Sequence, residues 1–149
     1  MPRGASWDKP SGTFQWFQGE VRVPAGLYYR DGHSIDSFEG DFHTLDEALV
    51  LHHDIGFYAG AFAQKRDAVL LEERGVEGAR AWVAQEKQIR SDLPPRFVVT
   101  FPDNDCANFW IDSWDRSGLD LVRSIADSFR PKRTQTSANS CEQRPSRLQ

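Results

Sequence analysis

Two neighbouring stretches of sequence decide the fold: RFVVTFPDNDCANFWIDSW at residues 96–114 and SGLDLVRSIADSFRP at residues 117–131. In the first stretch, apolar side chains alternate over residues 96–101 and again over residues 107–114, as is typical of β-strands with a buried face. The short polar side chains between these runs bond their own backbone and favour a turn. The first stretch therefore predicts a β-hairpin.

The second stretch predicts an amphipathic helix over residues 118–130. Ser117 and Asp120 have the spacing of a capping box, and Pro131 ends the helix. Apolar residues recur at i, i+3, i+4 and i+7 and form one stripe: Val122, Ile125, Ala126 and Phe129. Such a stripe must be buried, and the sheet is the large apolar surface available. We expect an α+β fold in which a twisted antiparallel sheet of about five to seven strands carries this helix on one face.

The rest of the chain predicts a single domain over residues 13–131. A flexible leader is expected at residues 1–12 and a disordered basic tail at residues 132–149, because both are rich in residues that break regular structure or avoid burial. Helix formers followed by Gly75 favour a helix over residues 64–74. Strands are expected at residues 14–23, 27–30, 35–44 and 48–53. Two ranges stay open: residues 57–63 fit a strand or a connector, and residues 79–90 fit a helix or a strand.

Composition limits the function classes. The chain has 149 residues, 39% of them hydrophobic, which suits one globular domain. It contains no apolar run near the ~18 residues that a membrane span needs. No secretory signal is visible at its start, so we expect a cytoplasmic protein, or one of the cell envelope if the chain is cropped.

The charge is distributed unevenly. The formal net charge of −4 divides into −8 for residues 1–129 and +4 for residues 130–149. An acidic body repels phosphate backbones, so nucleic-acid binding is not expected. The same field attracts a basic protein partner, which suggests an immunity or inhibitor protein that neutralises a basic toxin or enzyme. The sequence makes no prediction of oligomeric state.

The cysteines exclude several site types. Cys106 and Cys141 form no C-x-x-C pair, so a zinc ribbon or dithiol redox motif is excluded. Cys106 has no neighbouring cation that would lower the pKa of its thiol, and we expect it to be a buried, inert thiol. This cysteine usage favours a reducing compartment.

Histidines offer one candidate metal site. All four lie within residues 33–53, and His33, His43 and His52 are the set that would leave an open position, as a metal-dependent hydrolase needs. The spacing matches no established ligand motif, and a solvated sheet face accounts for it equally well. Without this site, no cofactor is expected and a non-catalytic role is favoured.

Two tryptophans of the hairpin are candidate binding residues. Trp110 and Trp114 fall near one face of residues 107–114 and suit ligand stacking or partner anchoring. Core packing explains them as well.

Several ordered motifs over residues 24–131 resemble an uncharacterised family of small bacterial proteins. The pattern D-S-x-x-G begins at Asp36, and D-I-G-x-x-A-G begins at Asp54. Trp82 follows, then T-F-P at residues 100–102 with A-N-F at residues 107–109, and lastly S-F-R at residues 128–130. The ending is similar to the PsbP/Mog1 type of fold, whose domains are mostly non-catalytic accessory or binding modules.

The resemblance implies a ligand pocket at the polar positions of the pattern, which are Asp36, Ser37, Asp54 and Asn108. Turn and bulge hydrogen bonding is the alternative role of these side chains. Together with Trp110 and Trp114 they are the predicted ligand or partner site. The sequence therefore favours a non-catalytic binding domain, with the immunity protein and the metal-dependent hydrolase as alternatives.

Overall fold

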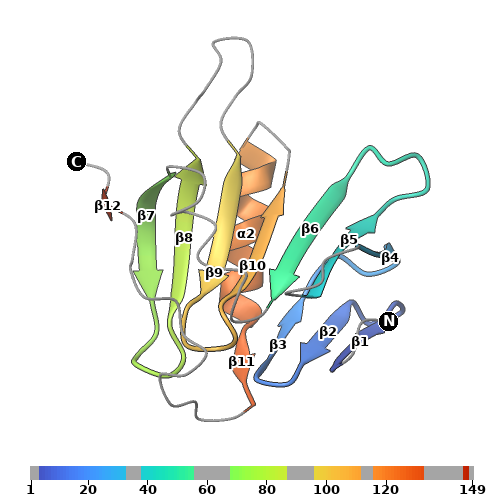
Figure 1. Cartoon of the computed structure of the whole chain (residues 1–149). Coiled ribbons are helices and arrows are strands. Elements are labelled where there is room, and N and C mark those ends of the chain that lie inside the picture. The colour runs from blue at the N-terminus through green and yellow to red at the C-terminus, as the bar shows by residue number, and fades with distance from the viewer. Residues whose placement is uncertain are drawn as a thin grey trace.

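The computed structural model describes residues 4–32, 38–55, 68–86, 96–111, 116–132 and 146–147. Two β-sheets and one helix account for the regular structure of these residues (Figure 1). The described part is sheet-rich, so it conforms only loosely to the α+β expectation. The sequence predicted one sheet, whereas the structure has two.

The smaller sheet is built from the two ends of the domain. Its strand order is β1-β2-β3-β11, and every pair is antiparallel. The strands are β1 (Ala5–Asp8), β2 (Thr13–Trp16), β3 (Gly19–Arg22) and β11 (Arg130–Pro131).

The larger sheet has the order β12-β7-β8-β9-β10-β6-β5-β4. All its pairs are antiparallel except the parallel pair of β12 with β7. Its strands are β4 (Tyr28–Asp31), β5 (Phe38–His43), β6 (Val50–Ile55), β7 (Ala68–Arg74), β8 (Ala81–Glu86), β9 (Phe97–Phe101), β10 (Ala107–Ile111) and β12 (Ser146–Arg147). The hairpin predicted for residues 96–114 is confirmed over its described part, where β9 pairs with β10.

Helix α2 (Arg116–Ser128) confirms the predicted amphipathic helix. It begins one residue before Ser117, so Ser117 lies in the first turn and is not the cap. The buried positions of the helix include Val122, Ile125 and Ala126. Phe129, just after the helix, stacks on Phe101 with ring centroids 4.2 Å apart.

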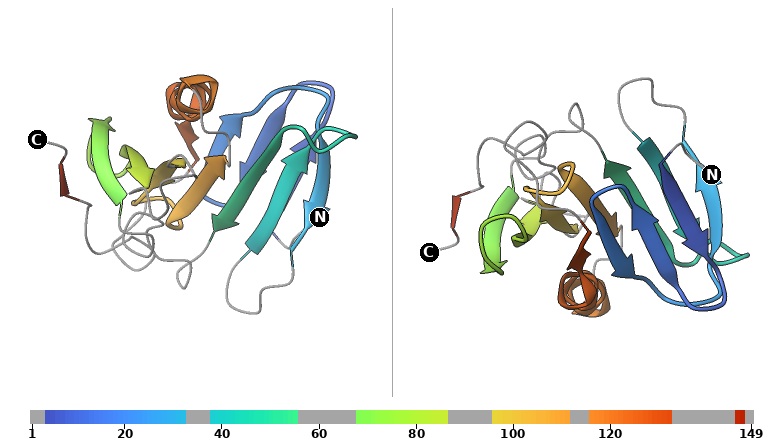
Figure 2. Two further views of the ribbon diagram at one scale, coloured as in Figure 1. Left: turned by 90° about the horizontal axis from the view of Figure 1, so that it is seen from above. Right: turned by 90° about the horizontal axis from the view of Figure 1, so that it is seen from below.

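The main core lies between the larger sheet and a second layer formed by α2 and the smaller sheet. Figure 2 shows α2 and the smaller sheet on the same side of the larger sheet. Every second residue of the large strands faces this layer, as the pleat requires. The fully buried members of the core include Phe14, Phe42, Leu51, Phe101, Phe109 and Ile125.

Several sequence predictions need correction. Residues 5–8, expected in a flexible leader, form β1. The single strand expected at residues 14–23 is the hairpin of β2 and β3. The described part of residues 64–74 is strand β7 rather than helix, and residues 81–86 settle the open choice for 79–90 as strand β8. Ser146–Arg147, expected in the disordered tail, pair with β7.

The turn at residues 102–106 between β9 and β10 confirms the predicted turn and is held from two sides. Asp103 accepts bonds of 2.8 and 2.6 Å from the Arg80 guanidinium and one of 3.0 Å from the Gly78 amide. Asp105 and Cys106 have positive φ angles of 62° and 49°. Cys106 is 1% exposed, which confirms its predicted burial, but it is disulfide-bonded, so the prediction of an inert thiol is wrong. Cys141 lies outside the described residues.

The Asp103–Arg80 contact predicts a stability effect. Burial opposes ionisation of Asp103, but the bonds from Arg80 and the Gly78 amide outweigh it and hold the pKa of this carboxyl below its usual value. We expect Asp103→Asn to lower the free energy of unfolding by about 1–3 kcal/mol, because the Arg80 guanidinium then donates to a neutral side chain in place of a carboxylate. Urea denaturation measures this loss. Asp127→Asn removes an exposed partner of Arg74 and should change nothing measurable; equal losses in both variants would contradict a special role for Asp103.

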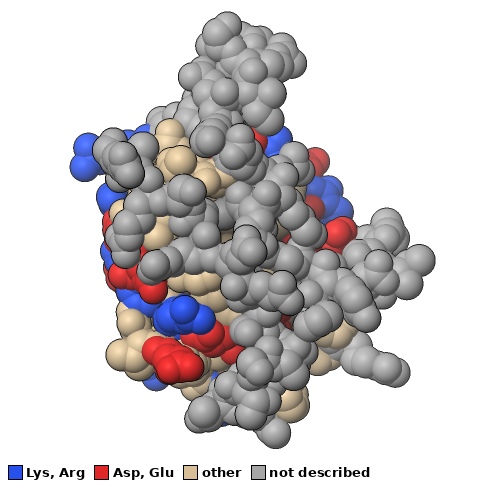
Figure 3. All heavy atoms as spheres, turned by 60° about the vertical axis from the view of Figure 1, so that its left-hand side comes forward, with Lys and Arg blue, Asp and Glu red and all other residues tan. Residues whose placement is uncertain are grey.

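Charged side chains of both signs are interleaved on the face shown in Figure 3. Two ion pairs join β7 to α2, Glu72 with Arg123 and Arg74 with Asp127, and a third links Glu72 to Arg74 within β7. Among the described residues, no helix combines the length and apolar character needed to cross a membrane.

Candidate functional site

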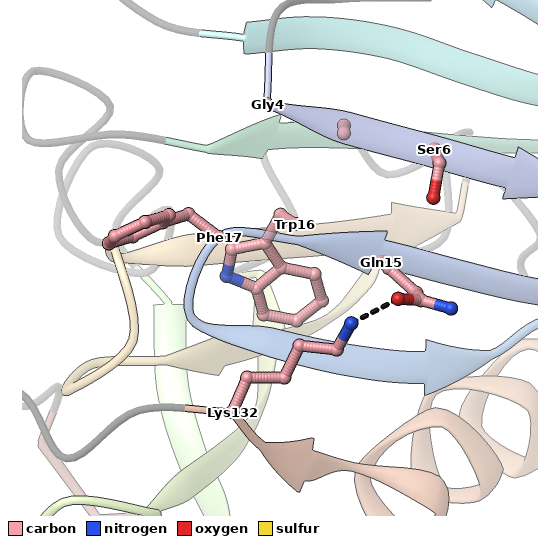
Figure 4. A pocket seen from close by; sticks show the side chains of 7 residues that line it. Gly4, Ser6, Gln15, Trp16, Phe17 and Lys132 are labelled. Carbon is pink, nitrogen blue, oxygen red and sulfur yellow. Dashed lines mark hydrogen bonds between the residues drawn. The ribbon is translucent and has the colours of Figure 1, made fainter.

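A groove of about 570 Å³ lies on the smaller sheet, and we call it the Phe17–Lys132 groove (Figure 4). Its lining residues come from the start of β1 and the position before it, from β2 and the turn that follows, and from the position after β11: Gly4, Ala5, Ser6, Gln15, Trp16, Phe17 and Lys132. Ligand pockets commonly have volumes of ~300–1,000 Å³. The groove is therefore large enough for a small molecule.

Strand pairing positions the polar side chains of the groove. Ser6 lies opposite Gln15 in the β1–β2 pair. Pro131 lies opposite Gly19 in the β3–β11 pair, which brings the next residue, Lys132, beside β2. The Lys132 ammonium donates a hydrogen bond to Gln15 Oε1, as the dashed line in Figure 4 shows.

The turn between β2 and β3 separates an exposed aromatic ring from a buried amide. Trp16 pairs with Gly19, so the turn has Phe17 and Gln18 at its centre. Phe17 is 56% exposed, whereas Gln18 is 0% exposed. A Cβ at Gly19 would lie 2.5 Å from Trp16 Cζ2 and 2.7 Å from Phe129 Cε1, so the close approach of these two rings requires glycine.

The groove offers binding chemistry. It combines a cation, a neutral amide, a hydroxyl and an exposed aromatic ring. Its lining residues include no His, Cys, Asp or Glu to act as a general base beside the Ser6 hydroxyl. This side-chain set suits a ligand that carries a carboxylate and an apolar part.

The structure brings three predicted site residues together on the outer face of the larger sheet, away from α2. Asn108 of β10 lies opposite Asp54 of β6, and Trp110 lies opposite His52. Asn108 is 1% exposed and accepts a 2.6 Å hydrogen bond from the Thr100 hydroxyl. Its amide nitrogen donates to the Cys106 carbonyl at 3.1 Å. Both hydrogen bonds lie within the β9–β10 hairpin and are of the structural kind given above as the alternative role of Asn108.

His52 and His43 of the metal hypothesis also lie on this outer face. The His52 ring stacks on Trp110, with centroids 5.2 Å apart and planes inclined by 15°. His43 Nδ1 lies 3.0 Å from Asp41 Oδ1. The described residues contain no group of three side chains arranged to hold a metal ion.

The remaining predicted site residues lie outside the described residues. These are His33, Asp36, Ser37 and Trp114.

His53 points to the opposite face from His52 and is buried in the main core. Its Nε2 lies 2.6 Å from the Tyr29 hydroxyl. Burial raises the pKa of Tyr29, and the charge of Asp31 and the hydrogen bond to its carboxylate add to the effect, so the hydroxyl keeps its proton. A Cβ on Gly40 would lie 2.5 Å from that hydroxyl oxygen and 2.9 Å from Nε2. Gly40 therefore leaves the space that the Tyr29–His53 pair occupies.

The sequence pattern does not predict the Phe17–Lys132 groove, because it places Phe17 inside a strand and Lys132 in the tail. The one local signal was Gly19, which follows the turn residues and is compatible with a chain reversal. Comparisons with protein-family models, with curated proteins and with solved structures gave no match, so the function is inferred from the geometry of the chain itself.

Proposed function

We propose that this protein is a non-catalytic binding module whose Phe17–Lys132 groove takes a small carboxylate with an aromatic or apolar part. The observation that carries the proposal is the pairing of an exposed ring, Phe17, with a cation, Lys132, across one groove of suitable size. Surface grooves with a few convergent polar groups are the usual form of a ligand site.

Each side chain has a defined part in the proposed binding. The Lys132 ammonium gives up its hydrogen bond to the neutral Gln15 oxygen and forms a charge-assisted hydrogen bond with the carboxylate. The Phe17 ring packs against the apolar part of the ligand. The small side chains Gly4 and Ala5 leave room for it.

The resemblance of the sequence to PsbP/Mog1-type accessory domains, a likeness of architecture alone, is a further reason to propose a binding role. The acidic body argues against nucleic-acid ligands.

The two alternatives have less support. Capture of a basic protein calls for a continuous acidic surface, but Arg30 binds Asp41 and Glu47 on the β4–β5 edge. A metal-dependent hydrolase calls for three converging ligands, and the described residues contain no such group.

We expect Phe17→Ala and Lys132→Gln each to weaken binding of 3-phenylpropionate by about three- to tenfold, since each removes about 0.5–1.5 kcal/mol of contact. NMR titration at millimolar ligand measures both affinities. The control variants Val76→Ala and Lys9→Gln change the same kinds of side chain at positions that do not line the groove, and should bind as the wild type does. Absence of binding by the wild type, or equal losses in the controls, would overturn the proposal.

A further inference from the structure

The Phe17–Lys132 groove contains more hydrogen-bond donors than the described part of the chain satisfies. Among the described residues, Lys132 forms no ion pair, and its ammonium donates to the neutral Gln15 Oε1. The Ser6 hydroxyl and the Gln15 Nε2 group form no hydrogen bond within the same part of the chain. An ammonium, an NH₂ group and a hydroxyl therefore share a groove whose lining contains no carboxylate.

Gln15 lies between the other two donors. It lies opposite Ser6 in the β1–β2 pair, so both side chains point to the same side of the smaller sheet, with Cβ atoms ~4.5–5.5 Å apart. Figure 4 shows the Ser6 hydroxyl pointing toward Gln15 from one side and the Lys132 ammonium reaching it from the other. All three residues line the groove, so a ligand there reaches them without entering the core.

One carboxylate adjoins this set on the neighbouring strand. Glu20 of β3 lies opposite Gln15, but it does not line the groove. Arg130 of β11 lies opposite Glu20 in turn, so a cation accompanies this negative charge. The formal charge of the groove lining therefore comes from Lys132.

The Gln15 amide presents its oxygen, rather than its NH₂ group, to the Lys132 ammonium. When Lys132 binds a ligand carboxylate instead, this oxygen loses its donor and its lone pairs face an anion. Half a turn about the last side-chain torsion exchanges the oxygen and the NH₂ group in nearly the same volume. The rotated amide can then donate to the carboxylate.

We propose that Gln15 sets the charge preference of the groove: its amide rotates when a carboxylate binds, and its NH₂ group then donates to the anion beside the Ser6 hydroxyl. This inference rests on the proposed function, which assigns the ligand to Lys132 and Phe17. A carboxylate has about four acceptor positions, enough for all three donors together. A neutral carboxamide needs an acceptor for its own NH₂ group, so it binds with Gln15 unrotated and gains no bond between full charges.

The experiment compares 3-phenylpropionate with its neutral isostere 3-phenylpropionamide in wild type, Gln15→Glu and Gln15→Leu. Glutamate keeps the shape of Gln15 but has acceptors in place of the NH₂ group, whereas leucine removes the donor and the acceptor together. Gln85→Glu is the control, because it adds the same charge on β8, outside the groove. NMR titration measures the affinities and follows the side-chain NH₂ resonances of Gln15.

Wild type is expected to bind the carboxylate about fivefold more tightly than the carboxamide, with a larger shift of the Gln15 NH₂ resonances. Gln15→Glu should weaken carboxylate binding about twentyfold through repulsion and leave carboxamide binding within about twofold, which reverses the preference. Gln15→Leu should weaken carboxylate binding about threefold and carboxamide binding less. Gln85→Glu should bind both probes as wild type does.

Three results would overturn the role of Gln15 and leave the proposed function intact. They are equal binding of the two probes by wild type, a retained carboxylate preference in Gln15→Glu, and an equal loss of both probes in Gln15→Leu, as a purely structural role would give. If wild type binds neither probe, the proposed function fails and the role of Gln15 fails with it.

Discussion

Replacing Phe14 by alanine is expected to lower the free energy of unfolding by about 3–5 kcal/mol, the usual cost of truncating a buried phenylalanine. Phe14 lies on β2, is 0% exposed, and joins the smaller sheet to the larger one. Its ring centroid lies 5.1 Å from that of Phe42, 6.0 Å from that of Phe109 and 5.0 Å from the centroid of the His53 ring. Alanine would leave a cavity where these strands meet.

Phe17→Ala is the matched control for this measurement, because it makes the same substitution three residues later in the same hairpin. Phe17 is 56% exposed, so its loss should change stability by less than about 0.5 kcal/mol. Urea denaturation of both variants measures the difference, provided that the free energy of unfolding falls with urea concentration at the same slope in each. Similar stabilities for the two variants would contradict the packing of the smaller sheet on the larger one.

The most local parts of the fold were the most predictable from sequence. The β9–β10 hairpin and α2 follow from alternation, a turn of short polar residues and a 3.6-residue apolar stripe, all within about 35 neighbouring residues. The hairpin of β2 and β3 was missed because its turn, Phe17–Gln18, consists of residues that are common inside strands.

Strand β7 shows tertiary context overriding propensity. Residues 64–74 contain good helix formers, and Gly75 suits a helix end. In the structure, Ala68 and Leu70 are buried on one face of a strand that pairs with β8. Helix propensity is a weak prior that such pairing routinely overrides.

The candidate site could not be predicted from local pattern at all. Its lining comes from residues 4–6, residues 15–17 and Lys132, which are brought together only by the strand order β1-β2-β3-β11. On β10, by contrast, alternation correctly placed Trp110 on the face opposite to Phe109 and Ile111. Alternation fixes the face of a residue within a strand, but not which strands are neighbours.

Burial of His53 in its neutral form makes the free energy of unfolding about 3 kcal/mol larger at neutral pH than in acid. Acidification from pH 7 to pH 4.5 is expected to remove most of this difference. His53 is 1% exposed, and this burial lowers the pKa of its imidazole from 6.5 to about 4, against the smaller opposing effects of the Phe38 main chain, Asp31 and Asp41. Between these two values the unfolded chain binds a proton that the folded protein does not. The stability is therefore complete above pH 6.5 and is lost as the pH falls through about 4.

His53→Gln tests this origin, because the glutamine amide can either donate to or accept from the Tyr29 hydroxyl and does not titrate. At pH 7 the variant is less stable than wild type through imperfect packing, but its stability should fall less steeply on acidification. His52→Gln retains His53 and should keep the wild-type loss. Denaturation midpoints across this pH range measure all three proteins. The variant removes a neutral histidine that is buried against Phe14, Phe42 and Phe109. If His53→Gln loses as much stability on acidification as wild type does, other groups cause the loss.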